Sequence, residues 1–466
     1  MSEHEFDVIV IGMGPGGEEV AGRLAEAGLA VAGIESRLVG GECPYFGCVP
    51  SKMMIRAANL LAEARRVPGM AGQASVEPGW APVARRIRDE ATDNWDDTVA
   101  ADRFIAKGGH LFRGTGRIVA PGEVEVTRAG GGASGGQDIT SDLLRARRGI
   151  VINTGTAPAV PPVPGLAGTP FWTNREAVRV TEVPDSLIVL GGGAVGVELA
   201  QVFARFGARV TVVEALGHLV PLEEPEAGEL LARVFESEGI GVRTGVKVSA
   251  ISHDGASFEV TLAGGTSLPA SRLLVATGRR VDLASVGAGA VGIDEKARAV
   301  PVDDRMRAAQ GVWAIGDIVG RGAFTHMSMY HAGIVIADIL GQDHHAAENH
   351  AVPRVTFTDP EIGSVGMTEA QAREQGIDVR TALTEVPSSA RGWIHKAGND
   401  GLIKLVQDAA AGVLVGATSA GPAGGEVLSM LTLAVHARVP AKRLREMIYA
   451  YPTFHRAVES ALADLT

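Results

Sequence analysis

The sequence predicts an α/β protein that contains two doubly wound parallel sheets. One pattern of strand, glycine-rich turn, helix, strand and acidic residue occurs twice along its 466 residues. Glycine accounts for 61 residues and gathers at the ends of predicted strands instead of recurring with a fixed period. Hydrophobic residues make up 46% of the chain, which allows large buried cores and excludes a disordered chain. At about 150 residues per domain, the length predicts roughly three domains.

The first copy of this pattern opens with an apolar strand at residues 7–11, directly before the sequence GMGPGG. A helical stretch follows, and a second apolar strand ends at Glu35. In a dinucleotide-binding fold, Gly12 permits the tight turn, Gly14 lets the backbone approach a pyrophosphate, and Gly17 lets the helix lie close to the strand. The helix N-terminus supplies N–H groups and a positive dipole, and Glu35 is placed to accept hydrogen bonds from a ribose.

The second copy, SLIVLGGGAVGVELAQVFARFGARVTVVE, keeps the register of the first. The matched pairs are Gly12 and Gly191, Gly14 and Gly193, Gly17 and Gly196, Gly28 and Gly207, and Glu35 and Glu214. Glycines that only form turns would not hold one spacing over all of these positions. The sequence therefore predicts two dinucleotide sites, and two such cofactors on one chain indicate electron exchange between them.

The acidic residue of the second copy favours NADH over NADPH. Glu214 would bond a ribose 2′-hydroxyl and repel a 2′-phosphate, and no arginine occurs in residues 215–220 to bind such a phosphate. A solvated carboxylate at the end of a strand is the alternative interpretation of Glu214.

The chain has two cysteines, Cys43 and Cys48, in one short segment, which favours a redox or metal role. Pro50 suits the first position of a helix, so Cys48 is expected near a helix N-terminus, where the dipole favours a thiolate. A turn at Gly47 could bring Cys43 back to bonding distance, whereas a regular helix would not. Zinc is disfavoured, because no histidine lies nearby to complete four ligands, and no metal site is predicted.

The overall charge excludes some partners. Acidic residues number 54 against 43 basic ones, giving a net charge of −11 and a pI near 5.6. Binding to nucleic acid or to an anionic membrane through the overall field is therefore not expected. The first residues, MSEHEFDVIVIG, lack the basic region of a secretory signal, and no apolar run approaches the ~18 residues of a membrane span. A cytoplasmic location is expected.

The cysteine segment, residues 39–64, resembles the redox-active disulfide segment of the class I pyridine nucleotide–disulfide oxidoreductases. This family includes lipoamide dehydrogenase, glutathione reductase and mercuric reductase, and the resemblance covers essentially the whole chain. Residues 152–165 and 273–280 resemble the segments where the family's chain passes into the NAD domain and back out of it. Residues 311–320 resemble the second FAD motif, and residues 353–372 resemble the start of the dimerisation domain.

The resemblance implies two doubly wound dinucleotide-binding domains, for FAD and NAD, plus a C-terminal α+β dimerisation domain. The FAD domain would be discontinuous, at residues 1–155 and 282–350, with the NAD domain at 156–281 inserted into it. Residues 351–466 would form the interface of a homodimer. The glycine-rich stretch at 128–139 is predicted to be a mobile hairpin tip within the FAD domain.

The resemblance also implies roles for individual residues. Cys48 would be the charge-transfer thiol beside the flavin and Cys43 the interchange thiol that faces the acceptor. Lys52 and Glu198 would form an ion pair beside flavin N5, and electrons would pass from NADH through FAD to the disulfide. The residues predicted to bind the cofactors are Gly12, Gly14, Gly17, Glu35, Thr154, Gly155, Gly191, Gly193, Gly196, Glu214, Gly278, Asp317 and His326.

The C-terminal segment YAYPTFHRAVESAL departs from the family pattern. Tyr451 stands where the family has its catalytic histidine, and Arg456 where it has the glutamate that orients this histidine. Tyrosine titrates near ~10, so it is a poor base at neutral pH, and losing a matched acid–base group costs about 10²–10⁴ in rate. An efficient lipoamide or glutathione reductase is therefore not expected. His455 paired with Glu459 could substitute, although a surface histidine is the favoured interpretation.

Two further departures concern the acceptor. The C-terminal cysteine pair of mercuric reductase does not occur here, so mercury reduction is not expected as the main activity. Tyr45 and Phe46, between the two cysteines, indicate either packing near the flavin or a pocket for a flat acceptor. Tyr451 and Arg456 offer a phenol and a cation, which would suit a carboxylate or phosphate on the acceptor.

Three functional hypotheses follow. The first is an NADH-dependent flavoprotein disulfide reductase with an unidentified small-molecule acceptor. The second is a diaphorase, in which the flavin reduces quinones or metal complexes directly. The third is a slow-turnover flavin-binding protein with a signalling role.

Overall fold

The computed structural model describes residues 2–129 and 139–465 and divides into two compact units. The first unit comprises Met1–Pro50, Ile87–Pro158 and Arg279–Asn349, and the second comprises Ser51–Arg86, Ala159–Gly278 and His350–Thr466. The predicted hairpin tip at 128–139 lies largely outside the described residues, and the three-domain division stays a prediction.

The first unit is built on a sheet with strand order β16-β17-β6-β1-β2-β3, in which all neighbours except β16 and β17 are parallel. Residues 8–11 of β1 are buried, as expected of a central parallel strand covered on both faces. The hairpin of β4 and β5 continues the sheet from the first half of β6. The strands are β1 (Ser2–Ile11), β2 (Val31–Glu35), β3 (His110–Arg113), β4 (Thr115–Ala120), β5 (Glu123–Ala129), β6 (Ile139–Ile152), β7 (Ala157–Pro158), β15 (Arg279–Arg280), β16 (Arg307–Ala309) and β17 (Val312–Ala314).

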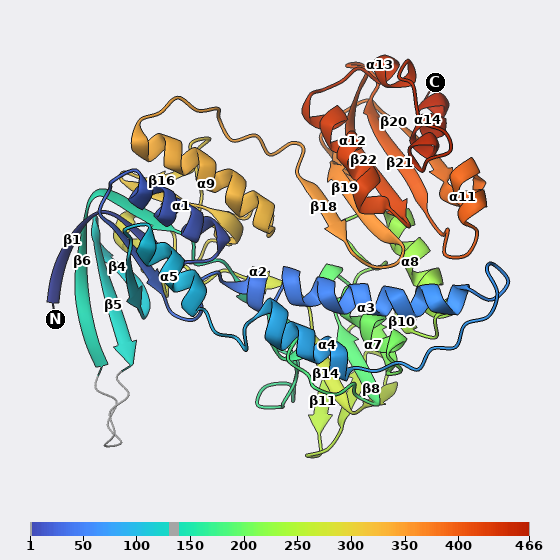
Figure 1. The fold of residues 1–466 in the computed structure, drawn as a ribbon, viewed down its shortest axis with the longest axis horizontal. Helices are drawn as coiled ribbons and strands as arrows, with labels where there is room; N and C mark the ends of the chain where they lie inside the picture. The colour runs from blue at the N-terminus through green and yellow to red at the C-terminus, as the bar shows by residue number, and fades with distance from the viewer. Residues whose placement is uncertain (1, 130–138, 466) are drawn as a thin grey trace. The chain divides into compact units, whose positions relative to one another are not determined.

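The glycine-rich turn of the first unit leads into α1, which lies beside α9 (Figure 1). A Cβ on Gly16 would overlap with the Ser328 hydroxyl, so a side chain at Gly16 would force these two helices apart. The helical elements are α1 (Pro15–Glu26), α2 (Glu42–Tyr45), the start of α3 (Cys48–Arg66), η1 (Ile87–Ala91), α5 (Thr98–Ala106), η2 (Ala288–Val291), η3 (Gly316–Val319) and α9 (Thr325–Leu340).

The second unit contains a fully parallel sheet of strand order β10-β9-β8-β14. The antiparallel strands β11, β12 and β13 lie between β10 and β14 along the chain. The strands β10, β9 and β8 lie side by side in the reverse of their order along the chain, as β3, β2 and β1 do in the first unit. The sequence repeat therefore corresponds to a repeated fold. The elements are α4 (Ala81–Arg86), α6 (Asn174–Ala177), β8 (Ser186–Leu190), α7 (Ala194–Arg205), β9 (Arg209–Val213), α8 (Pro225–Ser237), β10 (Gly241–Arg243), β11 (Val248–His253), β12 (Phe258–Leu262), β13 (Ser267–Ala270) and β14 (Arg272–Val275).

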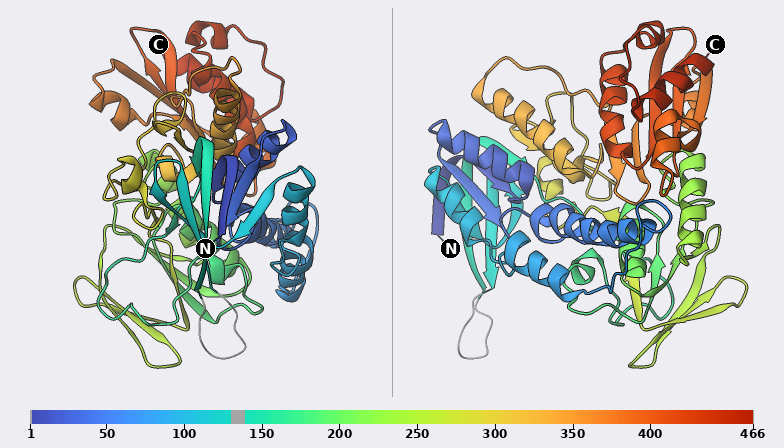
Figure 2. Two further views of the ribbon diagram at one scale, coloured as in Figure 1. Left: turned by 90° about the vertical axis from the view of Figure 1, so that its left-hand side faces the viewer. Right: turned by 45° about the vertical axis from the view of Figure 1, so that its right-hand side comes forward.

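The C-terminal part of the second unit is an antiparallel sheet of order β18-β19-β22-β21-β20, on which α12 and α14 pack around one apolar core (Figure 2). This confirms the predicted α+β architecture after two doubly wound sheets. The elements are β18 (Pro353–Thr356), β19 (Glu361–Gly366), α10 (Glu369–Glu374), β20 (Val379–Glu385), η4 (Val386–Ser388), α11 (Ala390–His395), β21 (Leu402–Asp408), β22 (Val413–Gly421), α12 (Gly424–His436), α13 (Ala441–Arg445) and α14 (His455–Asp464). Within residues 2–129 and 139–465, no helix has the length and apolar character needed to cross a membrane.

A buried histidine makes the first unit sensitive to acid. His331 on α9 is completely buried, and its Nδ1 accepts the Gly316 N–H at 3.3 Å. Burial lowers the pKa of His331 from 6.5 to about 4. Between these two pH values the unfolded chain takes up a proton that the folded chain does not, so the stability contributed by neutral His331 is lost as the pH falls through this window.

We expect the free energy of opening around α9 to fall by about 2 kcal/mol when the pH is lowered from 7.5 to 5, because His331 takes up a proton only in the opened state. Hydrogen exchange of the α9 amides at both pH values, corrected for intrinsic exchange, measures this change. The variant His331→Gln keeps a polar side chain that does not titrate, so it should lack this share of the pH dependence. Equal pH dependence in the two proteins would contradict the assignment.

Candidate active site

The first glycine-rich turn has the geometry of a dinucleotide cradle. Gly12 has a φ of +93°, and a Cβ on it would overlap with the Asn153 carbonyl oxygen. A Cβ on Gly17 would overlap with the Gly12 carbonyl oxygen, so α1 lies directly against the turn. Gly14 is the N-cap of α1, where the helix N–H groups begin. The side chain of Asn153, which the sequence analysis did not single out, donates to the Gly12 carbonyl at 3.0 Å.

Glu35 holds this turn from the end of β2. One carboxylate oxygen accepts the Met13 N–H at 2.9 Å and the other accepts the Arg37 N–H at 2.8 Å. Burial raises the pKa of Glu35, and the two N–H groups act against that rise. Because each carboxylate oxygen can accept a further hydrogen bond, this position remains suited to a ribose.

The second glycine-rich turn repeats these contacts. A Cβ on Gly196 would overlap with the Gly191 carbonyl oxygen, and Gly191 has a φ of +104°. Glu214 accepts the Gly192 N–H at 2.6 Å and the Leu216 N–H at 2.8 Å, as Glu35 does at the matching positions. Around Gly193, a Cβ would meet none of the described atoms within 4 Å. Both cradles therefore fit a dinucleotide that approaches along bare backbone.

Asp317 lies on η3 in a polar cluster of the first unit. Its Oδ2 accepts the Thr156 hydroxyl at 3.0 Å and lies 3.7 Å from Arg279 Nε. Burial raises the pKa of Asp317, while Arg279 and the Thr156 hydroxyl act to lower it. Thr156 and Arg279 each stand one residue after a predicted site residue, Gly155 and Gly278 respectively, and the sequence analysis passed over both.

The other predicted cofactor residues lie at exposed or open positions. Thr154 is exposed, and a Cβ on Gly155 or Gly278 would meet no described atom within 4 Å. Both glycines have positive φ, at +63° and +115°, which a side chain would strain. His326 is exposed at the start of α9, and its ring stacks on Phe324 with centroids 5.1 Å apart.

The two cysteines lie on either side of a tight turn. Cys43 belongs to α2 and Cys48 begins α3, with the Phe46 N–H donating to the Glu42 carbonyl at 2.8 Å between them. A Cβ on Gly47 would lie 3.7 Å from Cys43 Cα, so the chain at Gly47 turns back toward α2. The helix begins at Cys48 and not at Pro50; the first turn of a helix needs no internal N–H bonds, so it accommodates Pro50 there. The disulfide itself stays a prediction.

Cys48 has a neighbour that the sequence analysis missed. Its Sγ lies 3.4 Å from the Thr325 hydroxyl at the start of α9. A hydroxyl that donates to sulfur favours the thiolate over the thiol. The N-termini of α3 and α9 thus both lie at this thiol, although the two residues are far apart in sequence.

The aromatic residues between the cysteines are buried. Tyr45 and Phe46 are 6% and 8% exposed, and the Tyr45 carbonyl accepts the Trp95 indole N–H at 3.1 Å. Rings this deeply packed favour the packing interpretation over an open pocket for a flat acceptor.

The predicted Lys52–Glu198 ion pair is present in the second unit. Lys52 Nζ lies 2.9 Å from Glu198 Oε2, and Glu198 is only 5% exposed. The other carboxylate oxygen accepts the Phe357 N–H at 2.8 Å, and Lys52 Nζ lies 4.6 Å from the centre of the Phe357 ring. Phe357 was not predicted to take part in the site.

At the C-terminal segment, Tyr451 and Arg456 contact each other. Tyr451 is 71% exposed, and the Arg456 guanidinium lies 5.6 Å from its ring centre. Arg456 Nη1 also binds Glu459 Oε2 at 2.9 Å. The alternative interpretation, in which His455 acts as the base, requires Glu459 to pair with His455. In the structure Glu459 pairs with Arg456 instead.

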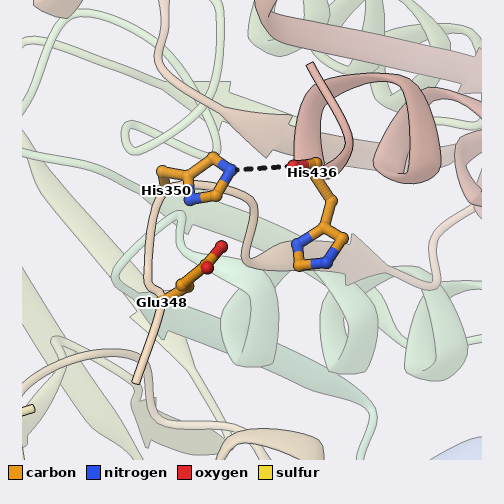
Figure 3. A group of neighbouring side chains, drawn as sticks. All are labelled: Glu348, His350 and His436. Carbon is orange, nitrogen blue, oxygen red and sulfur yellow. Dashed lines mark hydrogen bonds between the residues drawn. The ribbon is translucent and has the colours of Figure 1, made fainter. Parts of the chain in front are cut away.

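One surface pair of histidines is a candidate for metal binding. In the second unit the rings of His350 and His436 are nearly parallel, with centroids 5.7 Å apart, and His350 Nε2 donates to the His436 carbonyl at 3.2 Å (Figure 3). Both side chains are exposed, and two exposed imidazoles are fewer ligands than zinc sites in proteins provide.

Two glycine-lined cradles with matching acids, together with two nearby cysteines of which Cys48 begins α3, are typical of a flavoprotein oxidoreductase. The chain belongs to the family described as pyridine nucleotide-disulphide oxidoreductase, whose sequence model matches residues 6–332. The model of the dimerisation domain of the same family matches residues 352–462 and points to a homodimer. FAD and a pyridine nucleotide are the cofactors typical of this family.

The chain is similar over nearly its full length to several named relatives. It is 34% identical to the dihydrolipoyl dehydrogenase of Chlorobaculum tepidum, covering 99% of this chain and 97% of that protein. It is 31% identical to the mercuric reductase of Shewanella putrefaciens, covering 96% of this chain and 78% of that protein. Among solved structures, the fold is similar to that of RclA, an HOCl-induced flavoprotein disulfide reductase from Escherichia coli. The structure compared is a Cu(II) complex of the RclA C43S mutant. It has a TM-score of 0.83 and 27% sequence identity, and the match covers 100% of this chain and 99% of that chain.

Proposed function

We propose that this protein is an NADH-dependent flavoprotein reductase that uses Cys43 and Cys48 as its redox-active disulfide. The observation that carries the proposal is the turn that places Cys43 beside the start of α3, where Cys48 lies next to the Thr325 hydroxyl. The FAD, NAD and dimerisation domains predicted from the sequence belong to the same proposal.

In this proposal FAD would be held by the first glycine-rich turn and Glu35, where it would supply two-electron transfer from NADH to the disulfide. One electron pair breaks the sulfur–sulfur bond, and uptake of one proton leaves a thiol at Cys43 and a thiolate at Cys48. The helix N-terminus and Thr325 stabilise the Cys48 thiolate, and Cys43 then attacks the acceptor. Lys52 and Glu198 form the charged pair that the family places beside flavin N5.

The acceptor in this proposal is a small molecule other than lipoamide or glutathione. Those substrates need a base for the interchange thiol, and Tyr451 and Arg456 occupy the positions that supply it in the family. Because Arg456 is already paired with Glu459, an anionic acceptor would have to compete with that carboxylate. A neutral disulfide or a metal complex makes no such demand.

Direct reduction of a metal complex by the flavin is the second candidate function. It is favoured by the relatives, because the RclA structure is a Cu(II) complex and several of the similar proteins are named mercuric reductases. In this case the thiols would be secondary to turnover. Substitution of Cys48 separates the two candidates.

An anaerobic stopped-flow experiment tests the proposed function. Mixing the FAD-loaded protein with NADH should bleach the flavin and then produce a long-wavelength band from a thiolate beside it. Loss of flavin colour with no such band would favour direct reduction of the acceptor, and an unbleached flavin would contradict both candidates.

The cofactor preference gives a separate prediction. In FAD-loaded protein, Glu214→Gln should lower the preference for NADH, measured as kcat/KM for NADH divided by kcat/KM for NADPH, by about 10-fold. The substitution removes the charge that repels a 2′-phosphate but keeps an acceptor for the Gly192 N–H. Glu35→Gln is the matched control, since it makes the same change at the equivalent acid of the other cradle. It should leave that ratio unchanged. An unaltered ratio in Glu214→Gln would count against the assignment of this cradle.

A further inference from the structure

The segment at residues 357–359 is attached to α7 at three successive points. The Phe357 N–H donates to the Glu198 carboxylate. The Gln201 side chain accepts the Asp359 N–H and donates to the Asp359 carbonyl, both at 2.8 Å. Arg205 Nη2 binds the Asp359 carboxylate at 2.8 Å. The three α7 residues are spaced three and four apart, so they lie on one face of the helix. Each is no more than 5% exposed.

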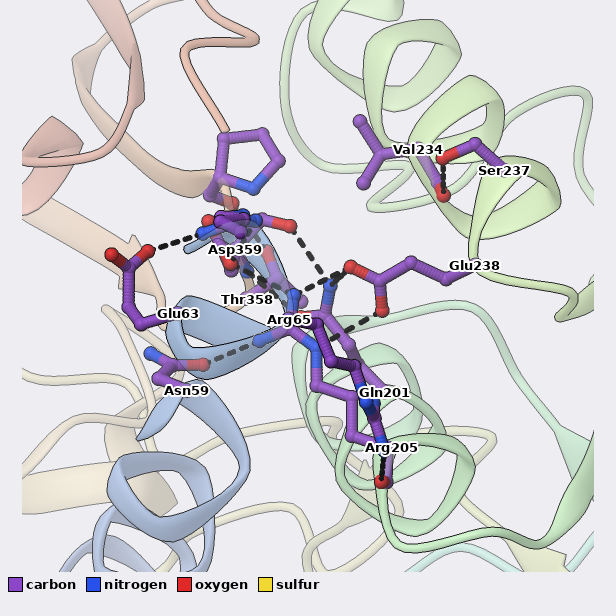
Figure 4. Close-up of polar contacts among 12 residues, drawn as sticks. Asn59, Glu63, Arg65, Gln201, Arg205, Val234, Ser237, Glu238, Thr358 and Asp359 are labelled. Carbon is purple, nitrogen blue, oxygen red and sulfur yellow. Dashed lines mark hydrogen bonds and ion pairs between the residues drawn. The ribbon is translucent and has the colours of Figure 1, made fainter. Parts of the chain in front are cut away.

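The same cluster also attaches α3, the helix that carries Lys52. Arg66 Nη2 binds Asp359 Oδ2 at 2.7 Å. Arg205 Nη1 donates to Asn59 Oδ1 at 2.7 Å (Figure 4). The Arg65 side chain donates to the Arg205 carbonyl at 2.8 Å. Glu238, the C-cap residue of α8, neutralises Arg205, with its two oxygens 2.5 and 3.0 Å from the guanidinium. One polar cluster, buried on its α7 side, therefore fixes the helix of Lys52 against the helix of Glu198.

Phe357 acts on both members of the ion pair at once. Its N–H occupies one oxygen of Glu198, which leaves the other oxygen for Lys52 and prevents the carboxylate from rotating. Its ring lies beside the Lys52 ammonium and restricts a side chain that is 36% exposed. Exposed ion pairs are usually weak because long side chains must be ordered, and here the neighbouring segment does this ordering.

We infer that Phe357, Gln201 and Asp359 are positioning residues that hold the Lys52–Glu198 pair in a single geometry. This inference rests on the proposed function, in which that pair acts at the flavin. It explains why the segment between β18 and β19 is tied to α7 by buried polar side chains, although apolar packing alone would hold two elements together at lower cost in desolvation.

Two variants test the inference. Phe357→Leu removes the ring but keeps the backbone N–H, and Gln201→Met removes the bonds to Asp359 while keeping the side-chain volume. Gln407→Met on β21 is the matched control, because it makes the same change at a buried glutamine that takes no part in the cluster.

The first readout needs no cofactor. Acylation of Lys52 in the FAD-free protein, followed by peptide mass spectrometry with Lys247 as internal reference, reports how firmly the ammonium is held. We expect labelling to accelerate about 2- to 10-fold in both test variants and not in Gln407→Met. In FAD-loaded protein, the limiting rate of flavin reduction should fall about 3- to 30-fold while the KM for NADH stays within about two-fold.

The outcomes distinguish this inference from the proposed function. If Lys52→Met slows flavin reduction but Phe357→Leu and Gln201→Met match the unmodified protein in labelling and in rate, the positioning role is wrong and the proposed function stands. If Lys52→Met reduces its flavin as fast as the unmodified protein, the pair has no role at the flavin, and the inference fails with that part of the proposed function.

Discussion

Replacing Cys48 with serine is expected to lower turnover with disulfide acceptors by about 10³-fold or more. Serine cannot form the sulfur–sulfur bond, and its hydroxyl does not ionise near neutral pH. The start of α3 and the Thr325 hydroxyl, 3.4 Å from Cys48 Sγ, stabilise an anion that serine does not provide. Steady-state assays with NADH and a panel of disulfides measure the loss.

Cys43→Ser is the matched variant, since it breaks the same bond but leaves the thiol of Cys48 in place. Both variants should still reduce their flavin with NADH and should still pass electrons to a quinone. If Cys43→Ser and Cys48→Ser keep full turnover with every acceptor that the unmodified protein reduces, the disulfide is not used, and direct reduction by the flavin becomes the function.

The second large effect is expected at the two glycines that lie against the turns. Gly17→Ala should lower FAD affinity by about 10- to 100-fold, because its Cβ would overlap with the Gly12 carbonyl and push α1 off the cradle. Gly196→Ala makes the same change against Gly191 in the other copy. It should retain FAD and instead raise the KM for NADH. Absorbance of the purified proteins near the flavin band, together with NADH titrations, separates the two effects.

Gly333→Ala on α9 is the control for this pair. A Cβ there would meet none of the described atoms within 4 Å, and alanine is the better helix former by about 1 kcal/mol. This variant should bind FAD as the unmodified protein does. If Gly196→Ala loses the flavin and Gly17→Ala keeps it, the assignment of the two cradles is reversed.

The repeated cradle could be predicted because its determinants are local in sequence. The turn, the close approach of the helix and the acid at the end of the second strand all fall within one strand–helix–strand unit. Gly17 and Gly196, and Glu35 and Glu214, accordingly make equivalent contacts in the structure. The ion pair of Lys52 and Glu198 came from the family resemblance, not from any local pattern.

The residues that were missed are brought in by long-range contacts. Thr325 reaches Cys48 from a helix at the other end of the first unit's sequence, and Phe357 reaches Glu198 from the segment after β18. No periodicity or spacing within one segment carries such a signal. The proline pattern predicts that α3 begins at Pro50, but the helix begins two residues earlier, at Cys48, because any position in the first turn of a helix tolerates proline.

The central claim is that the bound flavin and a Cys43–Cys48 disulfide form one electron-storage unit. An anaerobic titration of the FAD-loaded protein with NADH, followed by absorbance, tests it most directly. We predict uptake of two electron pairs per FAD, with a long-wavelength band after the first, and uptake of one pair without that band in Cys48→Ser. Uptake of a single electron pair by the unmodified protein, starting from its oxidised form, would contradict the claim.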